Sequence, residues 1–141
     1  MNLQQDKLTG GCSCGRVRYV ATGKPYKVSY CHCIDCRRAT GAPVVVAVMF
    51  VESRFRFSQG EPKLYESSEQ VFRGFCDICG TPLSWAGIWH RQPFVFIYLS
   101  TLDNPELVQP DRHAFCDYQI DWFDTDDDFP RFTSSSPCTD R

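Results

Sequence analysis

Three clusters of closely spaced cysteines are the residues of this chain best suited to chemistry. They are Cys12-Ser13-Cys14, Cys31-His32-Cys33-Ile34-Asp35-Cys36 and Cys76-Asp77-Ile78-Cys79-Gly80. Residues i and i+2 of an extended strand project from the same face, so a C-x-C pair presents two sulfurs to one ion. A C-x-x-C pair does the same through a tight turn, and two such pairs complete the closed four-thiolate geometry of structural zinc. This repeated spacing predicts metal ligands rather than buried small hydrophobic residues.

The seven clustered cysteines cannot form two sites of four thiolates each. The C-x-C-x-x-C cluster can supply three ligands locally, which leaves the two other pairs to combine. The sequence therefore predicts a four-ligand site of Cys12, Cys14, Cys76 and Cys79, and a three-ligand site of Cys31, Cys33 and Cys36. A three-ligand zinc keeps its fourth position for water or substrate, as catalytic sites do. The alternative is that His32, His113 or Cys116 fills this position.

Composition places the chain among globular proteins. It has 141 residues, of which 43% are hydrophobic and 23% charged, as expected for one soluble domain. The longest apolar run, Val44–Val51, is too short to cross a membrane. The net charge of −2 becomes more negative when thiolates form, which argues against nucleic acid as a partner.

The first residues, Met1–Lys7, lack the basic and apolar regions of a signal peptide. We therefore expect a cytoplasmic protein, in which closely spaced cysteines stay reduced and bind metal. The expected partner is a small molecule, with neither nucleic acid nor membrane involved. A homodimer is one candidate assembly.

Short apolar or alternating runs separated by Gly, Pro, Asn and Asp predict a mainly β fold with at most short helical turns. A short helix is expected over Asp35–Thr40, ended by Gly41 and Pro43. We expect one zinc-binding domain over residues 1–132 and a flexible tail over 133–141, which contains Cys138. The predicted strands are Val17–Ala21, Lys27–Cys33, Val44–Val51, Arg54–Phe57, Lys63–Glu66, Gln70–Cys76, Phe94–Ser100 and Ala114–Ile120.

Several motifs together resemble a known family. They are Gly11-Cys12-Ser13-Cys14-Gly15, Cys31-His32-Cys33-x-x-Cys36-Arg37, Gly41-Ala42-Pro43, Phe75-Cys76-x-x-Cys79-Gly80-Thr81-Pro82-Leu83, and the late His113 and Trp122. From about Gly10 to Phe132 the chain is similar to the glutathione-dependent formaldehyde-activating enzyme family, which also contains the centromere protein V domain. The resemblance implies a β-tent of antiparallel sheets around zinc, a fold shared with methionine sulfoxide reductase B and a Rab nucleotide-release factor.

The resemblance also implies two zinc ions with different roles. The four-cysteine set would hold a structural ion, and the three-cysteine set would hold a more labile ion near a glutathione site. Cys31, Cys33 and Cys36 would then be catalytic, in a zinc-dependent carbon–sulfur lyase or synthase resembling S-(hydroxymethyl)glutathione synthase. Its substrates would be a glutathione-type thiol and a small aldehyde such as formaldehyde.

Residues near the three-cysteine cluster are candidates for substrate binding. Arg37 and Arg38 follow its last cysteine, where guanidinium groups could hold a carboxylate or merely offset the anionic cluster. His113 is a candidate acid or base that contacts substrate. His32 lies between two ligands, so strand alternation predicts a packing role on the opposite face. The acidic stretch 121–128 is expected to be a solvated turn.

Two other functions remain as alternatives. One is a zinc-stabilised binding module that turns over no substrate. The other is a methionine sulfoxide reductase, which needs a reactive cysteine outside the metal clusters. Only Cys116 and Cys138 remain for that role, and Cys116 is predicted to be a buried, inert thiol on a strand.

Overall fold

The computed structural model describes residues 6–135, and this part of the chain is mainly β, as predicted. The single α-helix within residues 6–135, α1, covers Ile34–Thr40, close to the prediction. The strands are β1 (Lys7–Gly11), β2 (Arg18–Thr22), β3 (Lys27–Cys31), β4 (Val45–Val51), β5 (Phe55–Gln59), β6 (Lys63–Ser68), β7 (Val71–Phe75), β8 (Pro82–Trp89), β9 (Gln92–Tyr98) and β10 (His113–Ala114). Short 3₁₀ turns lie at Glu52–Arg54, Leu99–Thr101, Pro105–Leu107 and Cys116–Tyr118.

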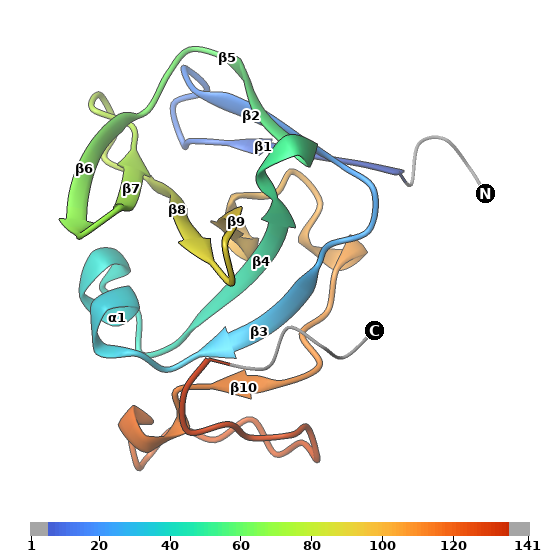
Figure 1. Cartoon of the computed structure of the whole chain (residues 1–141), viewed down its shortest axis with the longest axis vertical. Helices are drawn as coiled ribbons and strands as arrows, with labels where there is room; N and C mark the ends of the chain where they lie inside the picture. The colour runs from blue at the N-terminus through green and yellow to red at the C-terminus, as the bar shows by residue number, and fades with distance from the viewer. Residues whose placement is uncertain (1–5, 136–141) are drawn as a thin grey trace.

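The strands form two sheets, which Figure 1 shows with the three-stranded one at the top. That sheet has the order β1-β2-β5, and the larger sheet has the order β10-β3-β4-β9-β8-β7-β6. All the pairings between these strands are antiparallel except that of β10 with β3, which is parallel. The sheets are therefore antiparallel, as predicted, apart from this edge, where β10 arrives after a long connection from β9.

Strand β4 lies between β3 and β9 in the larger sheet and separates two hydrophobic cores. Val48 and Phe50 pack into one core, whereas Ala47 and Met49 pack into the other, because successive strand residues face opposite sides. The first core contains two members of the four-cysteine set and the second contains two members of the three-cysteine set. These are Cys12 and Cys76 in the first core, and Cys31 and Cys36 in the second.

Strands β1 and β8 are missing from the prediction. The last two residues of β1 are glycines, which are rare in strands. The structure shows why Gly10 stands there: a Cβ atom at this position would lie 2.3 Å from the Thr101 carbonyl oxygen and 2.4 Å from the Tyr19 hydroxyl oxygen. This glycine lets two segments approach closely, so it does not mark a loop.

The predicted strand Ala114–Ile120 is wrong after Ala114. Phe115 adopts a left-handed conformation with φ of 58°, which ends β10, and Cys116 then begins a 3₁₀ turn. Cys116 is consequently half-buried rather than part of an alternating strand face. Burial raises the pKa of its thiol, as expected for an unreactive cysteine.

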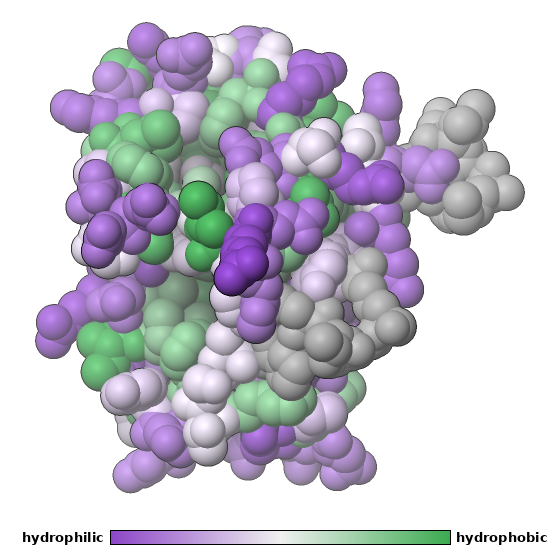
Figure 2. All heavy atoms as spheres, in the orientation of Figure 1, coloured by the Kyte–Doolittle hydropathy of each residue, from purple (hydrophilic) through white to green (hydrophobic). Residues whose placement is uncertain are grey.

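Ordered contacts continue past residue 132, since the amide of Phe115 donates to the carbonyl of Ser134 over 3.0 Å. Residues 136–141 of the predicted tail, including Cys138, lie outside the described residues. Figure 2 shows a face on which hydrophilic residues predominate and hydrophobic ones form small separate areas. Within residues 6–135, no helix has the length and apolar character needed to cross a bilayer.

Candidate metal centres

The four-cysteine cluster brings together two segments that are far apart in sequence. The sulfurs of Cys12, Cys14, Cys76 and Cys79 all lie within 4.8 Å of one another. Cys14 Sγ lies 3.6 Å from Cys12 Sγ and 3.8 Å from Cys76 Sγ. A tetrahedral zinc with Zn–S bonds of about 2.3 Å requires sulfurs about 3.8 Å apart, so the donor set and its spacing fit zinc.

Two matching turns hold these cysteines. In each, a glycine with φ near 80° follows the second cysteine, Gly15 after Cys14 and Gly80 after Cys79. The amide of each glycine donates to the carbonyl of the first cysteine of its turn, at 3.1 Å and 2.8 Å. The left-handed backbone favours glycine, and in the first turn the Val17 amide donates to Cys12 Sγ over 3.2 Å.

Thr81 joins the two turns to each other. Its hydroxyl accepts a hydrogen bond from the Ser13 amide and lies 3.1 Å from Cys79 Sγ. Hydrogen bonds from the Thr81 hydroxyl and amide lower the pKa of Cys79 to about 5. These hydrogen bonds thus favour the thiolate form of Cys79, the form that binds metal.

The three-cysteine cluster is built at the junction of β3 and α1. Cys31 ends the strand, Cys33 is the N-cap of the helix, and Cys36 lies in the first helical turn. The Cys36 amide donates to Cys33 Sγ over 3.2 Å, and hydrogen bonds from Cys31 and Cys36 lower the pKa of Cys33 to about 2. The three sulfurs lie within 4.8 Å of one another, and no fourth His, Cys, Asp or Glu among the described residues joins them.

A buried arginine that we did not predict contacts this cluster. Arg73, in β7, is only 7% exposed, and its Nη2 donates to Cys36 Sγ over 3.7 Å. Its Nη1 donates to the Tyr98 hydroxyl over 2.9 Å. One signal was available in the sequence, because Arg73 interrupts the apolar row of Val71 and Phe75 on one face of the predicted strand.

Arg73 and Tyr98 also line a pocket of about 230 Å³. The pocket lies between α1 and strands β6 to β9, and Gly80 of the four-cysteine cluster borders it. Its lining is Ala39, Tyr65, Arg73, Gly74, Phe75, Gly80, Pro82, Ser84 and Tyr98. No clustered cysteine lines this pocket, but Arg73 links it to Cys36 of one cluster and Gly80 follows Cys79 of the other. A larger hollow of about 960 Å³ lies between the start of β3 and residues 107–112, and its lining includes neither Arg73 nor Gly80 nor any of the clustered cysteines.

The two arginines predicted to bind substrate lie in the last turn of α1. Arg37 is half-buried and Arg38 is exposed, and neither lines the pocket beside Arg73. Their role in substrate binding stays a prediction.

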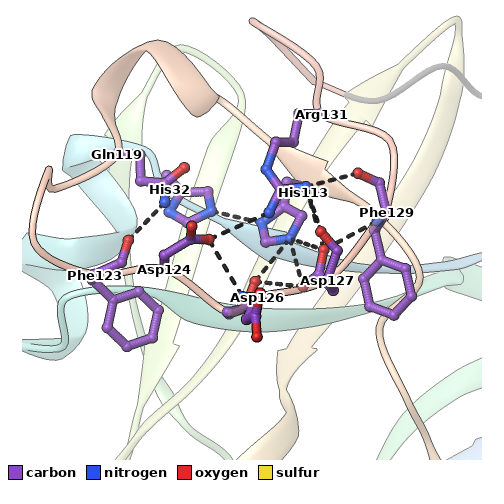
Figure 3. Close-up of polar contacts among 10 residues, drawn as sticks. His32, His113, Gln119, Phe123, Asp124, Asp126, Asp127, Phe129 and Arg131 are labelled. Carbon is purple, nitrogen blue, oxygen red and sulfur yellow. Dashed lines mark hydrogen bonds and ion pairs between the residues drawn. The ribbon is translucent and has the colours of Figure 1, made fainter.

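His32 and His113 meet where β10 pairs with β3, in the network that Figure 3 shows. His32 Nε2 lies 2.9 Å from His113 Nδ1, and His113 Nε2 lies 3.1 Å from both carboxylate oxygens of Asp127. Asp127 accepts from His113 Nε2–H, and in a neutral His113 the other ring nitrogen, Nδ1, then accepts from His32 Nε2–H. Both histidines are almost fully buried, in agreement with the predicted packing role of His32.

The network corrects the expectation that the acidic stretch 121–128 is merely solvated. The Asp127 side chain is only 15% exposed, and the Thr125 hydroxyl also donates to it. Burial favours the protonated form, but the hydrogen bonds from Thr125 and His113 lower the pKa of Asp127 to about 2. Through His113, the Asp127 carboxylate thus connects the C-terminal segment to His32, the residue between Cys31 and Cys33.

We expect His113→Phe to lower the free energy of unfolding by about 1–3 kcal/mol, because it leaves the buried His32 N–H without its acceptor. Urea denaturation in excess zinc measures this, with Trp122→Ala, at a position 77% exposed, as the control that should change little. Both zinc ions should stay bound. Loss of one ion in the variant would instead indicate that His113 contributes to the metal site.

Comparisons with known proteins support the fold and identify the family. A crystal structure of a Rhodobacter sphaeroides protein from structural genomics matches with a TM-score of 0.57 and 23% identity, over 72% of this chain and 96% of that one. This match supports the fold. A search of curated proteins found no match. Residues 7–118 match the profile described as glutathione-dependent formaldehyde-activating enzyme, and because they make up most of the chain, the chain belongs to that family.

Proposed function

We propose that this chain is a zinc-dependent carbon–sulfur lyase or synthase that joins a glutathione-type thiol to a small aldehyde. The observation that carries the proposal is the three-cysteine cluster, to which the described residues add no fourth ligand. The neighbouring pocket and family membership support it. In the reaction, the thiol sulfur bonds to the aldehyde carbon and the thiol proton ends on the aldehyde oxygen, so the product is a hemithioacetal.

Cys31, Cys33 and Cys36 would hold the catalytic ion. When bound, zinc would supply a Lewis acid that favours the thiolate form of a thiol and polarises a carbonyl oxygen. The chain itself sets the surroundings: Cys31 and Cys36 are buried in the second core, and Arg73 donates to Cys36 Sγ. Burial raises the pKa of Tyr98, so its phenol stays protonated and can donate a hydrogen bond.

The other centre would have a purely structural role. Its four thiolates fill a tetrahedral site, which leaves no position for substrate. The described cysteines are all unpaired, which supports the proposal that the protein works in the reducing cytoplasm on a small-molecule thiol.

The proposal is tested by thiol binding to cobalt-substituted protein. Adding glutathione should increase sulfur-to-cobalt charge-transfer absorption, and calorimetry near pH 7 should show proton release, because a free thiol has a pKa of about 8.5. The S-methylated analogue cannot form a thiolate and should bind much more weakly. Cys116→Ser, outside both clusters, is the matched control and should respond like the unmodified protein.

A cobalt spectrum that does not respond to saturating glutathione, without proton release, would overturn the proposal. The zinc-stabilised binding module would then be the better description of this chain.

A further inference from the structure

The buried guanidinium of Arg73 has no carboxylate partner among the residues that the structure describes. Its polar contacts are the Tyr98 hydroxyl and Cys36 Sγ. A guanidinium has five N–H donors, so these two contacts leave several free. A buried arginine of this kind binds a planar anion well, because its donors form a rigid fork.

The pocket beside Arg73 contains further hydrogen-bond donors and no acidic side chain. Tyr98 accepts from Arg73, which leaves its own proton for a ligand. Ser84 lines the pocket from β8. The absence of a side chain at Gly74 keeps the Ser84 hydroxyl accessible, because a Cβ on Gly74 would lie 2.6 Å from Ser84 Oγ. A guanidinium with further hydrogen-bond donors beside it is an arrangement that binds a carboxylate.

The size and position of the pocket indicate which molecule carries that carboxylate. At about 230 Å³, the pocket is smaller than the cavities of about 300–1,000 Å³ that hold drug-sized ligands. Arg73 Nη2 is only 3.7 Å from Cys36 Sγ. A ligand whose carboxylate binds Arg73 can therefore reach the three-cysteine cluster only with atoms that are a few bonds from that carboxylate. Both carboxylates of glutathione are many bonds from its sulfur, whereas in a 2-oxo acid the carboxylate is bonded directly to the reacting carbon.

We propose that Arg73, Tyr98 and Ser84 form a carboxylate site, and that the preferred aldehyde of this chain is therefore a small oxo acid, of which glyoxylate is the simplest. This rests on the proposed function and specifies its substrate class. The thiol sulfur bonds to the aldehyde carbon of glyoxylate, the carbonyl π electrons become a lone pair on oxygen, and the thiol proton moves to that oxygen. The product is a 2-hydroxy-2-thio acid, and no oxidant or reductant is needed.

Binding of glycolate to the zinc-loaded protein tests the site without turnover. Glycolamide has the same shape but no charge, and by calorimetry it should bind about 10- to 100-fold more weakly. Arg73→Gln should remove this preference for glycolate. Ser84→Ala and Gly74→Ala keep the charge and should weaken glycolate binding by smaller factors, so the test does not depend on folding of the arginine variant.

Arg56→Gln is the matched control, since Arg56 is exposed on β5 of the smaller sheet, outside the pocket and both cysteine clusters. This variant should bind glycolate as the unmodified protein does. Loss of binding in this variant rather than in Arg73→Gln, or equal affinity for glycolate and glycolamide, overturns the proposal. Neither result bears on the cobalt response to thiol, which tests the proposed function separately.

A competition experiment distinguishes the two sources of the carboxylate. Saturating glutathione should leave glycolate binding intact, because its carboxylates do not reach Arg73. Displacement of glycolate by glutathione, but not by the uncharged thiol 2-mercaptoethanol, would assign the site to the thiol substrate and overturn the oxo-acid assignment. With the site intact, acceleration of thiol addition should be larger for glyoxylate than for formaldehyde.

Discussion

Cys76→Ser should leave the domain unfolded or insoluble. Cys76 is fully buried in the first core, and it belongs to the cluster that joins the first turn of the chain to the β7–β8 turn. A structural zinc site contributes about 10–16 kcal/mol, whereas the total stability of a domain is about 5–15 kcal/mol. Circular dichroism and thermal melting measure the result. Cys116→Ser is the control, and a folded Cys76→Ser protein with two bound ions would contradict the structural role of this centre.

Cys33→Ser should keep the fold, lose one of two zinc ions and reduce thiol–aldehyde addition to the uncatalysed rate. Serine is a favourable N-cap, so its oxygen can replace Cys33 Sγ as acceptor for the Cys36 amide and preserve α1. Only the metal ligand is lost. Elemental analysis, melting and addition kinetics together measure this outcome.

A matched comparison decides between the two centres. Cys33→Ser and Cys76→Ser each remove one sulfur, so equal destabilisation by both would contradict the division into a structural and a catalytic site. Retention of two ions in Cys33→Ser would show that another group completes the site.

The sequence predicts the grouping of the cysteines well because the spacing within each motif is local chemistry. C-x-C and C-x-x-C segments bring their own sulfurs together, and the requirement for four ligands pairs the first cluster with the last. The structure groups the seven cysteines in this way. Most strands are also predicted within a few residues, because alternating burial marks them.

What the sequence does not reveal depends on tertiary contacts. The hairpin of β8 and β9 has His90-Arg91 at its turn, with φ of 51° and 63°, where Asn-Gly is the usual signal. The role of Arg73 depends on Tyr98 in β9 and Cys36 in α1, which approach it only in the folded sheet. Asp127 looks like one acidic residue among several until His113 is placed beside it.

The two centres differ in how much of the polypeptide each one needs, and this affects their order of assembly. The three-cysteine set lies within residues 31–36, so a ribosome-bound chain can offer all three thiols at once. The four-cysteine set joins Cys14 to Cys76 across 62 positions, which requires closing a long loop after the later cysteines have been synthesised. During synthesis, the three-cysteine set can thus acquire an ion first, while the four-cysteine set can be filled only after Cys79 has been synthesised.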